Sequence, residues 1–172
     1  MAKLIGKVYK EIGLLSRGHT VKVTRADLVA EYMGQTAVKT KRCIDRAMGG
    51  VLFIDEAYTL KRGGSGGDDF GQEAIDTLLE QMSDRNGEFA VIAAGYPKPM
   101  KAFLDSNPGF ESRFEKDFLL RDYTAKELCQ IFLQKCQKKR FVLAEDLLEV
   151  LDLLFVNMID AWIKIWAIGR KI

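Results

Sequence analysis

Apolar runs and amphipathic segments alternate along the first hundred residues. The runs at residues 51–54 and 89–94 are continuous and have strand length, and Val21-Lys22-Val23 is a shorter third run. Continuous apolar runs of this length are typical of strands buried on both faces of a parallel sheet. The remaining pattern predicts helices at residues 4–15, 25–32, 36–48, 75–82 and 99–104. Strands that alternate with helices predict an α/β fold with a parallel sheet.

The pattern changes near residue 122, where a second and helical part begins. Thr124 and Glu127 have the spacing of a capping box, which predicts the start of a helix. The leucine-rich residues 143–156 predict another helix. Before this part, residues 107–110 have the composition of a turn, and residues 117–120 predict a last short strand. The very apolar residues 159–168 fit either a final lid helix or an exposed surface that causes association.

The composition is that of an ordinary globular protein. The 172 residues are 48% hydrophobic and 29% charged, close to the averages of globular domains. A net charge of +2 gives no electrostatic case for a nucleic-acid or membrane partner. Three cysteines without a CxxC pair and a single histidine, His19, give little support to a disulfide framework or a zinc site. Residues 1–7 lack the apolar run of a signal peptide, so we expect a cytoplasmic protein.

Two adjacent carboxylates, Asp55 and Glu56, directly follow the apolar run at residues 51–54. Ligands of open α/β sheets gather at the carboxyl ends of the strands, which is where both acids are expected. In nucleotide hydrolysis, an Asp at this place holds Mg²⁺ while a Glu orients or activates the attacking water. The alternative is a strand that ends in two solvated acids or a helix cap. The glycine-rich residues 62–69 predict a flexible surface loop, because no Lys-Ser or Lys-Thr follows them as in a phosphate cradle.

In order and spacing, these motifs resemble those of the AAA+ ATPases. The likeness is strongest to the group that contains stage V sporulation protein K and the red-type rubisco activases, and it extends from Ala2 to about Asn157. The resemblance implies an α/β core of the AAA+ P-loop NTPase type, truncated at its N-terminus, over residues 1–121. It implies a small, incomplete helical lid over residues 122–172. The activity implied is the ATP-driven remodelling of a protein substrate by a hexameric ring of identical subunits, with ATP and Mg²⁺ as cofactors.

The resemblance assigns catalytic roles to three residues. Residues 49–58 match the Walker B strand, with Asp55 in the magnesium role and Glu56 in the water-activating role. Residues 107–114 are similar to the arginine-finger segment, with Arg113 as the finger. An arginine finger acts on the transferred phosphate, where it is worth ~10³–10⁵ in rate. The alternative for Arg113 is an ordinary surface ion pair.

Further roles concern nucleotide sensing and substrate grip. Tyr96 stands at the sensor 1 position and Arg170 at the sensor 2 position, so the resemblance implies that both contact ATP. Residues 30–36 look like pore loop 1, which faces the central channel of the ring in the family. Its gripping residues are then Tyr32, Met33 and Gly34. The alternative for Tyr32 is an exposed aromatic residue beside a flexible glycine.

One essential motif of the family is missing from the sequence. The phosphate-binding loop, Gly-x-x-x-x-Gly-Lys followed by Ser or Thr, occurs nowhere in the 172 residues. This loop supplies the backbone amides and the lysine that hold the β- and γ-phosphates. Three hypotheses therefore stay open: an ATP-driven ring remodeller, a non-catalytic ring or partner-binding subunit that lends Arg113 to a neighbour, and a fragment of a longer ATPase that is inactive alone.

Overall fold

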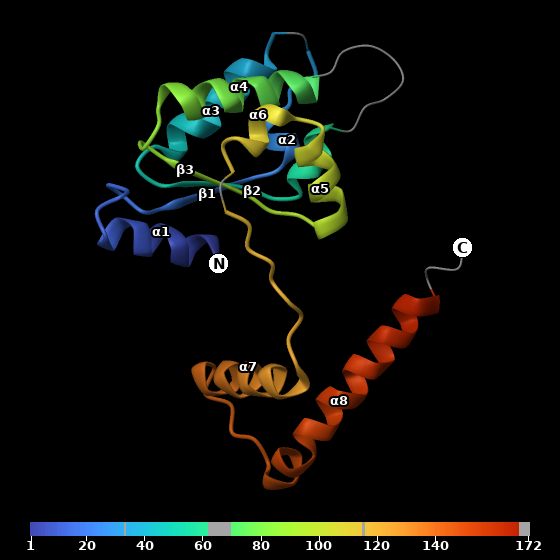
Figure 1. Ribbon diagram of the computed structural model, residues 1–172. Coiled ribbons are helices and arrows are strands. Elements are labelled where there is room, and N and C mark those ends of the chain that lie inside the picture. Colours follow the sequence, from blue (N-terminus) through green and yellow to red (C-terminus); the bar gives the residue numbers. More distant parts are fainter. Residues whose placement is uncertain (33, 62–69, 115, 169–172) are drawn as a thin grey trace. The chain divides into compact units, whose positions relative to one another are not determined.

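The chain forms two compact units, Met1–Asp117 and Phe118–Ile172 (Figure 1). The computed structural model describes residues 1–32, 34–61, 70–114 and 116–168, with side chains described as far as residue 159, except for that of residue 111. The glycine-rich segment at residues 62–69, for which we predicted a flexible loop, lies outside these residues. The domain boundary that the resemblance implies, between residues 121 and 122, stays a prediction.

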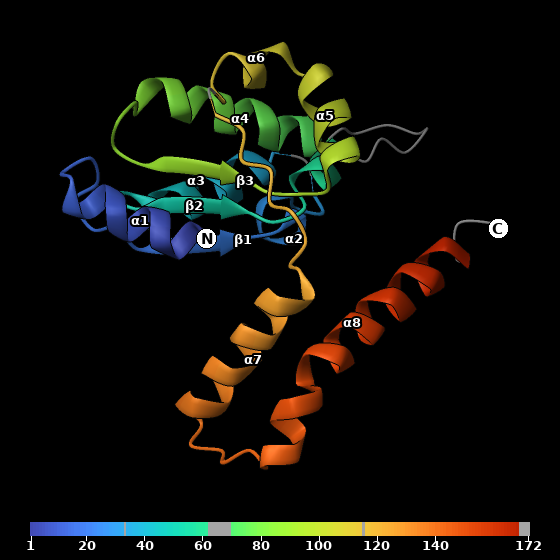
Figure 2. The same ribbon diagram turned by 60° about the horizontal axis from the view of Figure 1, so that its bottom comes forward.

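The first unit is built on a three-stranded parallel sheet with the order β1-β2-β3. The strands are β1 (Thr20–Val23), β2 (Val51–Ile54) and β3 (Ala90–Ala93). In this register Leu52 pairs with Val21 on one side and with Val91 on the other. Figure 2 shows that the three arrowheads point to the same edge of the sheet. The predicted α/β class and its parallel sheet are confirmed.

Helices α3 (Thr36–Ala47) and α4 (Phe70–Asp84) cover one face of the sheet (Figures 1 and 2). The core lies between them and the strands, and its fully buried side chains include Ile44, Leu52, Ile75 and Leu78. Complete burial of such a side chain contributes about 1.5–3 kcal/mol. This layer therefore holds β2 in place.

Helix α1 (Ala2–Glu11) covers the other face, but it does so with a different side from the one we predicted. The predicted apolar stripe includes Leu4 and Val8, which are 61% and 47% exposed. The side that meets the sheet instead carries Gly6, where a Cβ would lie 2.6 Å from the Gly18 carbonyl oxygen. This close backbone approach sets the rotation of the helix, because only glycine fits there. The helix also ends at Glu11, before Leu15.

Three short helical segments stand at the carboxyl edge of the sheet: α2 (Arg25–Leu28), the 3₁₀ helix η1 (Ala57–Lys61) and α5 (Pro97–Asp105). The prediction that α2 continues to residue 32 is wrong. Val29 has an extended backbone with ψ of 134°, and the Ala30 N–H donates to the Thr36 hydroxyl at 3.0 Å. The chain is thereby drawn toward the start of α3.

Two further predictions, for residues 107–110 and 117–120, are corrected. Asn107 does not open a simple turn but precedes a short helix, α6 (Pro108–Glu111), in which proline occupies the first turn. Phe110 is 1% exposed and fixes this helix in the core. Residues 117–120 form no strand, and Leu119 is 80% exposed. An isolated apolar run forms a strand only where a neighbouring strand offers hydrogen-bond partners.

The second unit contains α7 (Ala125–Lys138) and α8 (Glu145–Ile168). The predicted capping box is confirmed: the Thr124 hydroxyl accepts from the Glu127 N–H, and the Glu127 carboxylate accepts from the Thr124 N–H at 2.9 Å. Arg121 and these capping bonds lower the pKa of Glu127 to about 2. Helix α8 is longer than predicted and continues to Ile168. Within the described residues, no helix has the length and apolar character needed to cross a membrane.

Candidate functional site

Strand β2 brings Asp55 and Glu56 to the carboxyl edge of the sheet. Its residues Val51 and Leu52 are fully buried, and strands pair with it on both sides. The parallel pairing continues to the Asp55 N–H, which donates to the Val23 carbonyl at 2.9 Å. Beyond this bond the backbone leaves the sheet. Asp55 is half-buried and Glu56 is exposed, so both carboxylates are accessible at this edge.

Glu56 has a left-handed backbone conformation with φ of 50°. For a residue other than glycine this conformation costs about 1–2 kcal/mol. Two bonds from the following turn hold the residue there: the Thr59 hydroxyl donates to its carbonyl at 2.7 Å, and the Tyr58 hydroxyl donates to its carboxylate at 3.1 Å. The orientation of the Glu56 carboxylate is therefore fixed by η1.

Asp55 forms an ion pair with Lys22 of β1, with 2.7 Å between the ammonium nitrogen and Oδ2. The strand register explains this contact. Lys22 pairs with Phe53, and Asp55 is two residues farther along the chain, directly after β2. Residues two apart on a strand share a face, so Lys22 and Asp55 are diagonal neighbours on the same face of the sheet.

The two acids line a cavity of about 510 Å³ at this edge. The other walls come from α2 and its N-cap residue, the segment after α2, α3 and η1: Thr24, Arg25, Ala26, Val29, Ala30, Glu31, Lys39 and Thr59. A volume of this size is within the usual range of small-molecule sites. The arrangement thus joins two carboxylates to a space that can hold a small ligand.

Two cations in the walls are bound to backbone carbonyls. The Arg25 guanidinium donates to the Thr59 and Leu60 carbonyls at 3.0 and 2.5 Å, and the Lys39 ammonium donates to the Ala26 and Val29 carbonyls at 2.7 and 2.9 Å. These bonds tie η1 to α2 and α2 to α3. Both side chains therefore shape the cavity.

Helix α2 is fixed by its own capping box. The Asp27 carboxylate accepts from the Thr24 N–H and from the Thr24 hydroxyl, both at 2.8 Å. These two bonds hold the pKa of Asp27 below its ordinary value. The start of α2, where Thr24 lines the cavity, is thereby set by a local interaction.

The donor set suits a magnesium ion that is bound together with a phosphate. Within the described residues, no group of three or more His, Cys, Asp or Glu side chains is placed to hold a metal. Mg²⁺ commonly keeps several waters and uses only one or two carboxylates together with substrate phosphates. The accessible carboxylate of Asp55 fits that kind of binding.

Tyr96 follows the neighbouring strand β3 at the same edge. It occupies the N-cap position of α5 and is 63% exposed. Just before it, Gly95 lies against the Tyr58 ring, where a Cβ would come within 2.7 Å of Cδ1. The end of β3 can thus lie close to Tyr58 because residue 95 has no side chain.

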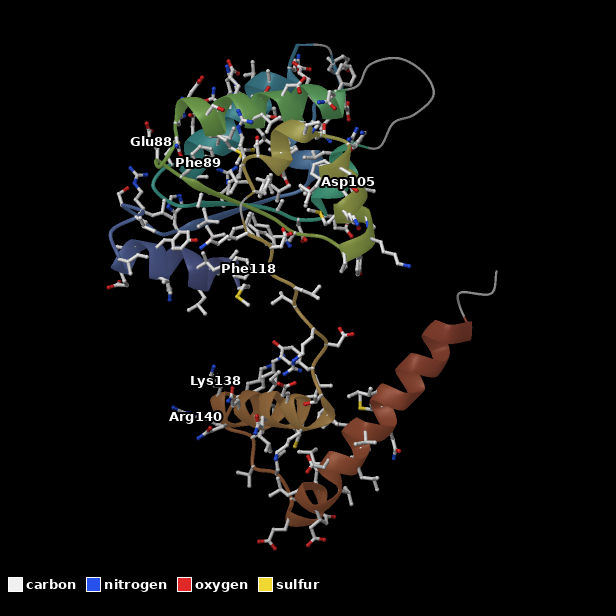
Figure 3. The ribbon with its side chains drawn as sticks, viewed as in Figure 1. Glu88, Phe89, Asp105, Phe118, Lys138 and Arg140 are labelled. Carbon is white, nitrogen blue, oxygen red and sulfur yellow. The ribbon has the colours of Figure 1, made fainter. Side chains whose placement is uncertain are left out.

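Arg113 lies in a different part of the unit, after α6. Its guanidinium donates to the Ser83 hydroxyl through Nε at 3.1 Å and Nη2 at 2.5 Å, and to the Gly109 carbonyl at 2.9 Å. Ser83 belongs to the last turn of α4. Figure 3 shows the two ends of this unit: Glu88, which follows α4, lies at one end, and Asp105, which ends α5, lies at the other.

Helix α4 separates Arg113 from the two acids. Near its start, Gly71 packs directly on the Leu60 carbonyl of η1, the segment that holds Glu56. Ser83 lies about 18 Å farther along α4 at 1.5 Å per residue. Arg113 and the acid pair therefore do not share one site within a single chain.

Tyr32 is 68% exposed and stands in the segment between α2 and α3. Gly34 has φ of 73°, with open space around it. Ala30 and Glu31, just before Tyr32, line the acid cavity, so this segment is joined directly to the site. The predicted site residues Met33 and Arg170 lie outside the described residues.

The sequence analysis missed Lys22, Arg25, Lys39 and Tyr58. The available signal for Lys22 was a charged residue between two valines in a short apolar strand. Side chains alternate between the two faces of a strand, so this lysine lies on the opposite face from the valines. The partners of Arg25 and Lys39 are backbone carbonyls, which no side-chain pattern reveals. For Tyr58 the sequence showed only that it is close to the acids along the chain, not that its hydroxyl donates to Glu56.

Comparison with known proteins gives the family. The sequence matches the family described as "AAA: ATPase family associated with various cellular activities" over residues 2–121, more than half of the chain. The chain belongs to this ATPase family.

Individual relatives support the same assignment. The chain is 46% identical to stage V sporulation protein K of Bacillus subtilis over 85% of its length, and 48% identical to protein CbbX of Cereibacter sphaeroides over 75%. It is 40% identical to the ESX-3 secretion system protein EccA3 of Mycolicibacterium smegmatis over 94%. The matched parts cover 45%, 41% and 26% of these three proteins, so the chain spans less than half the length of each.

The left-handed backbone of Glu56 generates a prediction about stability. Replacing Glu56 by glycine relieves the backbone strain, whereas alanine keeps it, and both variants lose the carboxylate. We expect the Glu56→Gly variant to be about 1 kcal/mol more stable than Glu56→Ala. Urea unfolding of the two variants, followed by circular dichroism, measures this difference. Equal stabilities, or a less stable glycine variant, would show that residue 56 is not strained.

Proposed function

We propose that this chain is the ATP-hydrolysing module of a ring-forming protein remodeller that works in the cytoplasm. The observation that carries the proposal is Glu56, a carboxylate held in left-handed backbone beside Asp55 at the end of a buried parallel strand. Strained backbone of this kind clusters at active sites, where the surrounding structure maintains it. Membership of the ATPase family supports ATP as the nucleotide.

In this proposal the two acids do different work. Asp55 holds the magnesium ion that accompanies ATP, and that ion neutralises charge on the phosphates. Glu56 accepts a hydrogen bond from the attacking water and directs it at the γ-phosphate. The Tyr58 hydroxyl bonds Oε1 of Glu56, and the second carboxylate oxygen takes the water. Tyr96, at the end of the neighbouring strand, contacts the nucleotide, and the family resemblance gives Arg170, outside the described residues, a role at the same nucleotide.

Arg113 serves the site of a neighbouring subunit. It is exposed and lies near the far end of α4 from η1, so within its own chain it is remote from Asp55 and Glu56. A ring of identical subunits, a hexamer in the likeness of the family, brings this arginine to the next acid pair. Each site then consists of Asp55 and Glu56 from one subunit and Arg113 from another.

Tyr32 contacts the protein substrate. Its ring is exposed, and an aromatic ring grips an extended chain through apolar surface without requiring a particular sequence. The segment that carries it contributes Ala30 and Glu31 to the acid cavity. A change in the cavity during hydrolysis therefore reaches Tyr32 through the adjoining residues Ala30 and Glu31.

A second candidate is a non-catalytic subunit that lends Arg113 to a neighbour. Arg113 is exposed and is anchored to Ser83, away from the acid pair of its own chain, which fits this role as well. Both candidates are tested with a loop-joined form, in which a strand and a phosphate-binding loop of the family pattern precede Ala2.

One prediction of the proposed function concerns ATP. The 172 residues alone should bind ATP weakly and hydrolyse it negligibly, because two acids cannot replace the phosphate contacts of the missing loop. The loop-joined form should bind and hydrolyse ATP, and its Glu56→Gln variant should bind with similar affinity and lose at least about 100-fold in kcat. Fluorescent ATP titration and a phosphate-release assay measure both quantities. A loop-joined form that neither binds nor hydrolyses ATP would favour the non-catalytic subunit, which binds no nucleotide itself.

The second prediction separates action within a subunit from action between subunits. Loop-joined Arg113→Ala and Glu56→Gln proteins should each be inactive, and their mixture should regain part of the ATPase activity. The gain arises because some interfaces in a mixed ring pair an intact Glu56 with an intact Arg113. Phosphate release is measured across mixing ratios. No gain at any ratio would place Arg113 outside the neighbour's site.

The third prediction concerns Tyr32. In the loop-joined form, Tyr32→Ala should keep ATP hydrolysis within a few-fold of the parent and lose the ability to unfold a protein substrate. Tyr32→Phe should retain unfolding, since the ring face provides the grip. Unfolding of a tagged fluorescent protein is the measurement. If Tyr32→Ala instead loses its fold by circular dichroism, the tyrosine is structural and the pore role is wrong.

A further inference from the structure

Lys22 stands out because it is a charged residue inside a strand of four. Its neighbours Val21 and Val23 are 8% and 1% exposed and face the core, whereas the Lys22 side chain is 63% exposed on the opposite face. The strand register makes it a diagonal neighbour of Asp55. The contact is therefore set by the sheet, although the lysine side chain itself has room to move.

Lys22 is also distinguished from the other cations of the site by its partner. Arg25 and Lys39 both donate to backbone carbonyls. Within the described part of the chain, Lys22 is the residue that forms an ion pair with a carboxylate of the cavity, at 2.7 Å from Asp55 Oδ2. The other carboxylates that line the cavity are Glu31 and Glu56.

We propose that Lys22 is a built-in counter-ion of Asp55 that competes with a divalent cation for this carboxylate. This inference rests on the proposed function, in which Asp55 holds the metal ion. An ammonium beside Asp55 Oδ2 occupies a lone-pair direction and repels an approaching dication. Because Lys22 is largely exposed, it can swing into water when the dication binds. Lys22 thereby sets how tightly the site takes its metal.

The test uses the 172-residue chain and Mn²⁺ alone as the probe. The ¹⁵N-labelled chain is titrated with Mn²⁺, and paramagnetic broadening of the Glu56 and Ala57 amide signals gives a dissociation constant at this place. Low ionic strength is needed, since salt screens exposed charges. The same spectra show whether each variant is folded.

Four variants separate the effect of Lys22 from a change in net charge. Lys22→Met should lower the Mn²⁺ dissociation constant by about threefold to tenfold, the size expected for removing one nearby exposed charge. Lys22→Arg keeps the charge and should stay within about twofold of the parent. Lys41→Met is the matched control: Lys41 pairs with Glu80 at 3.6 Å on α3 and α4, and its loss should also change affinity by less than about twofold. Asp55→Asn should abolish the local broadening.

Each outcome decides a different question. If Lys22→Met behaves like Lys41→Met while Asp55→Asn removes the broadening, Asp55 binds the metal and the proposal for Lys22 is overturned. If Asp55→Asn leaves the broadening unchanged, Asp55 is not the ligand, and both the metal role in the proposed function and the counter-ion role of Lys22 fail. If the parent and Lys22→Met both show no broadening, Lys22 does not set the affinity for a divalent cation and its counter-ion role is overturned, whereas the proposed function, in which the metal binds together with a phosphate, still stands.

Discussion

The structure of the first unit depends on the double pairing of β2. This strand lies between β1 and β3, and its Val51 and Leu52 are fully buried. Hydrogen bonds to both neighbouring strands therefore fix its backbone conformation, and this pairing ends at Asp55. There the chain must leave the sheet within two residues, and Glu56 takes a left-handed conformation to do so. The rigid strand and the strained exit together place two carboxylates at one defined edge.

The same constraint explains how the parts of the site are divided. Groups that stand near the acids come from segments at the carboxyl ends of the strands, such as Thr24, which directly follows β1, and Tyr58 in η1. Arg113 is instead anchored by Ser83 near the far end of α4. A rigid helix cannot shorten that separation. Arg113 and the acid pair thus lie in different parts of the first unit, which is the layout that our proposal of a site shared between subunits needs.

Much of this fold was predictable, because burial on both faces leaves a clear mark in the sequence. The run at Val51–Ile54 and the capping box at Thr124 gave the correct elements. The prediction failed for α1, where Gly6 decides the packing side although it has no side chain. It also failed after Leu28, where one bond from Ala30 to the Thr36 hydroxyl ends the helix. For the candidate site, the acids were identifiable, but the Lys22 contact needed the strand register.

The account is tested most directly by a cryo-electron microscopy structure of the loop-joined form with Mg²⁺ and a non-hydrolysable ATP analogue. It predicts a ring in which Asp55 lies beside the metal ion and Glu56 faces the γ-phosphate at the carboxyl edge of β2. The arginine at that phosphate should be Arg113 of the adjacent subunit. Nucleotide bound away from this edge, or contacted by Arg113 of the same chain, would contradict the account.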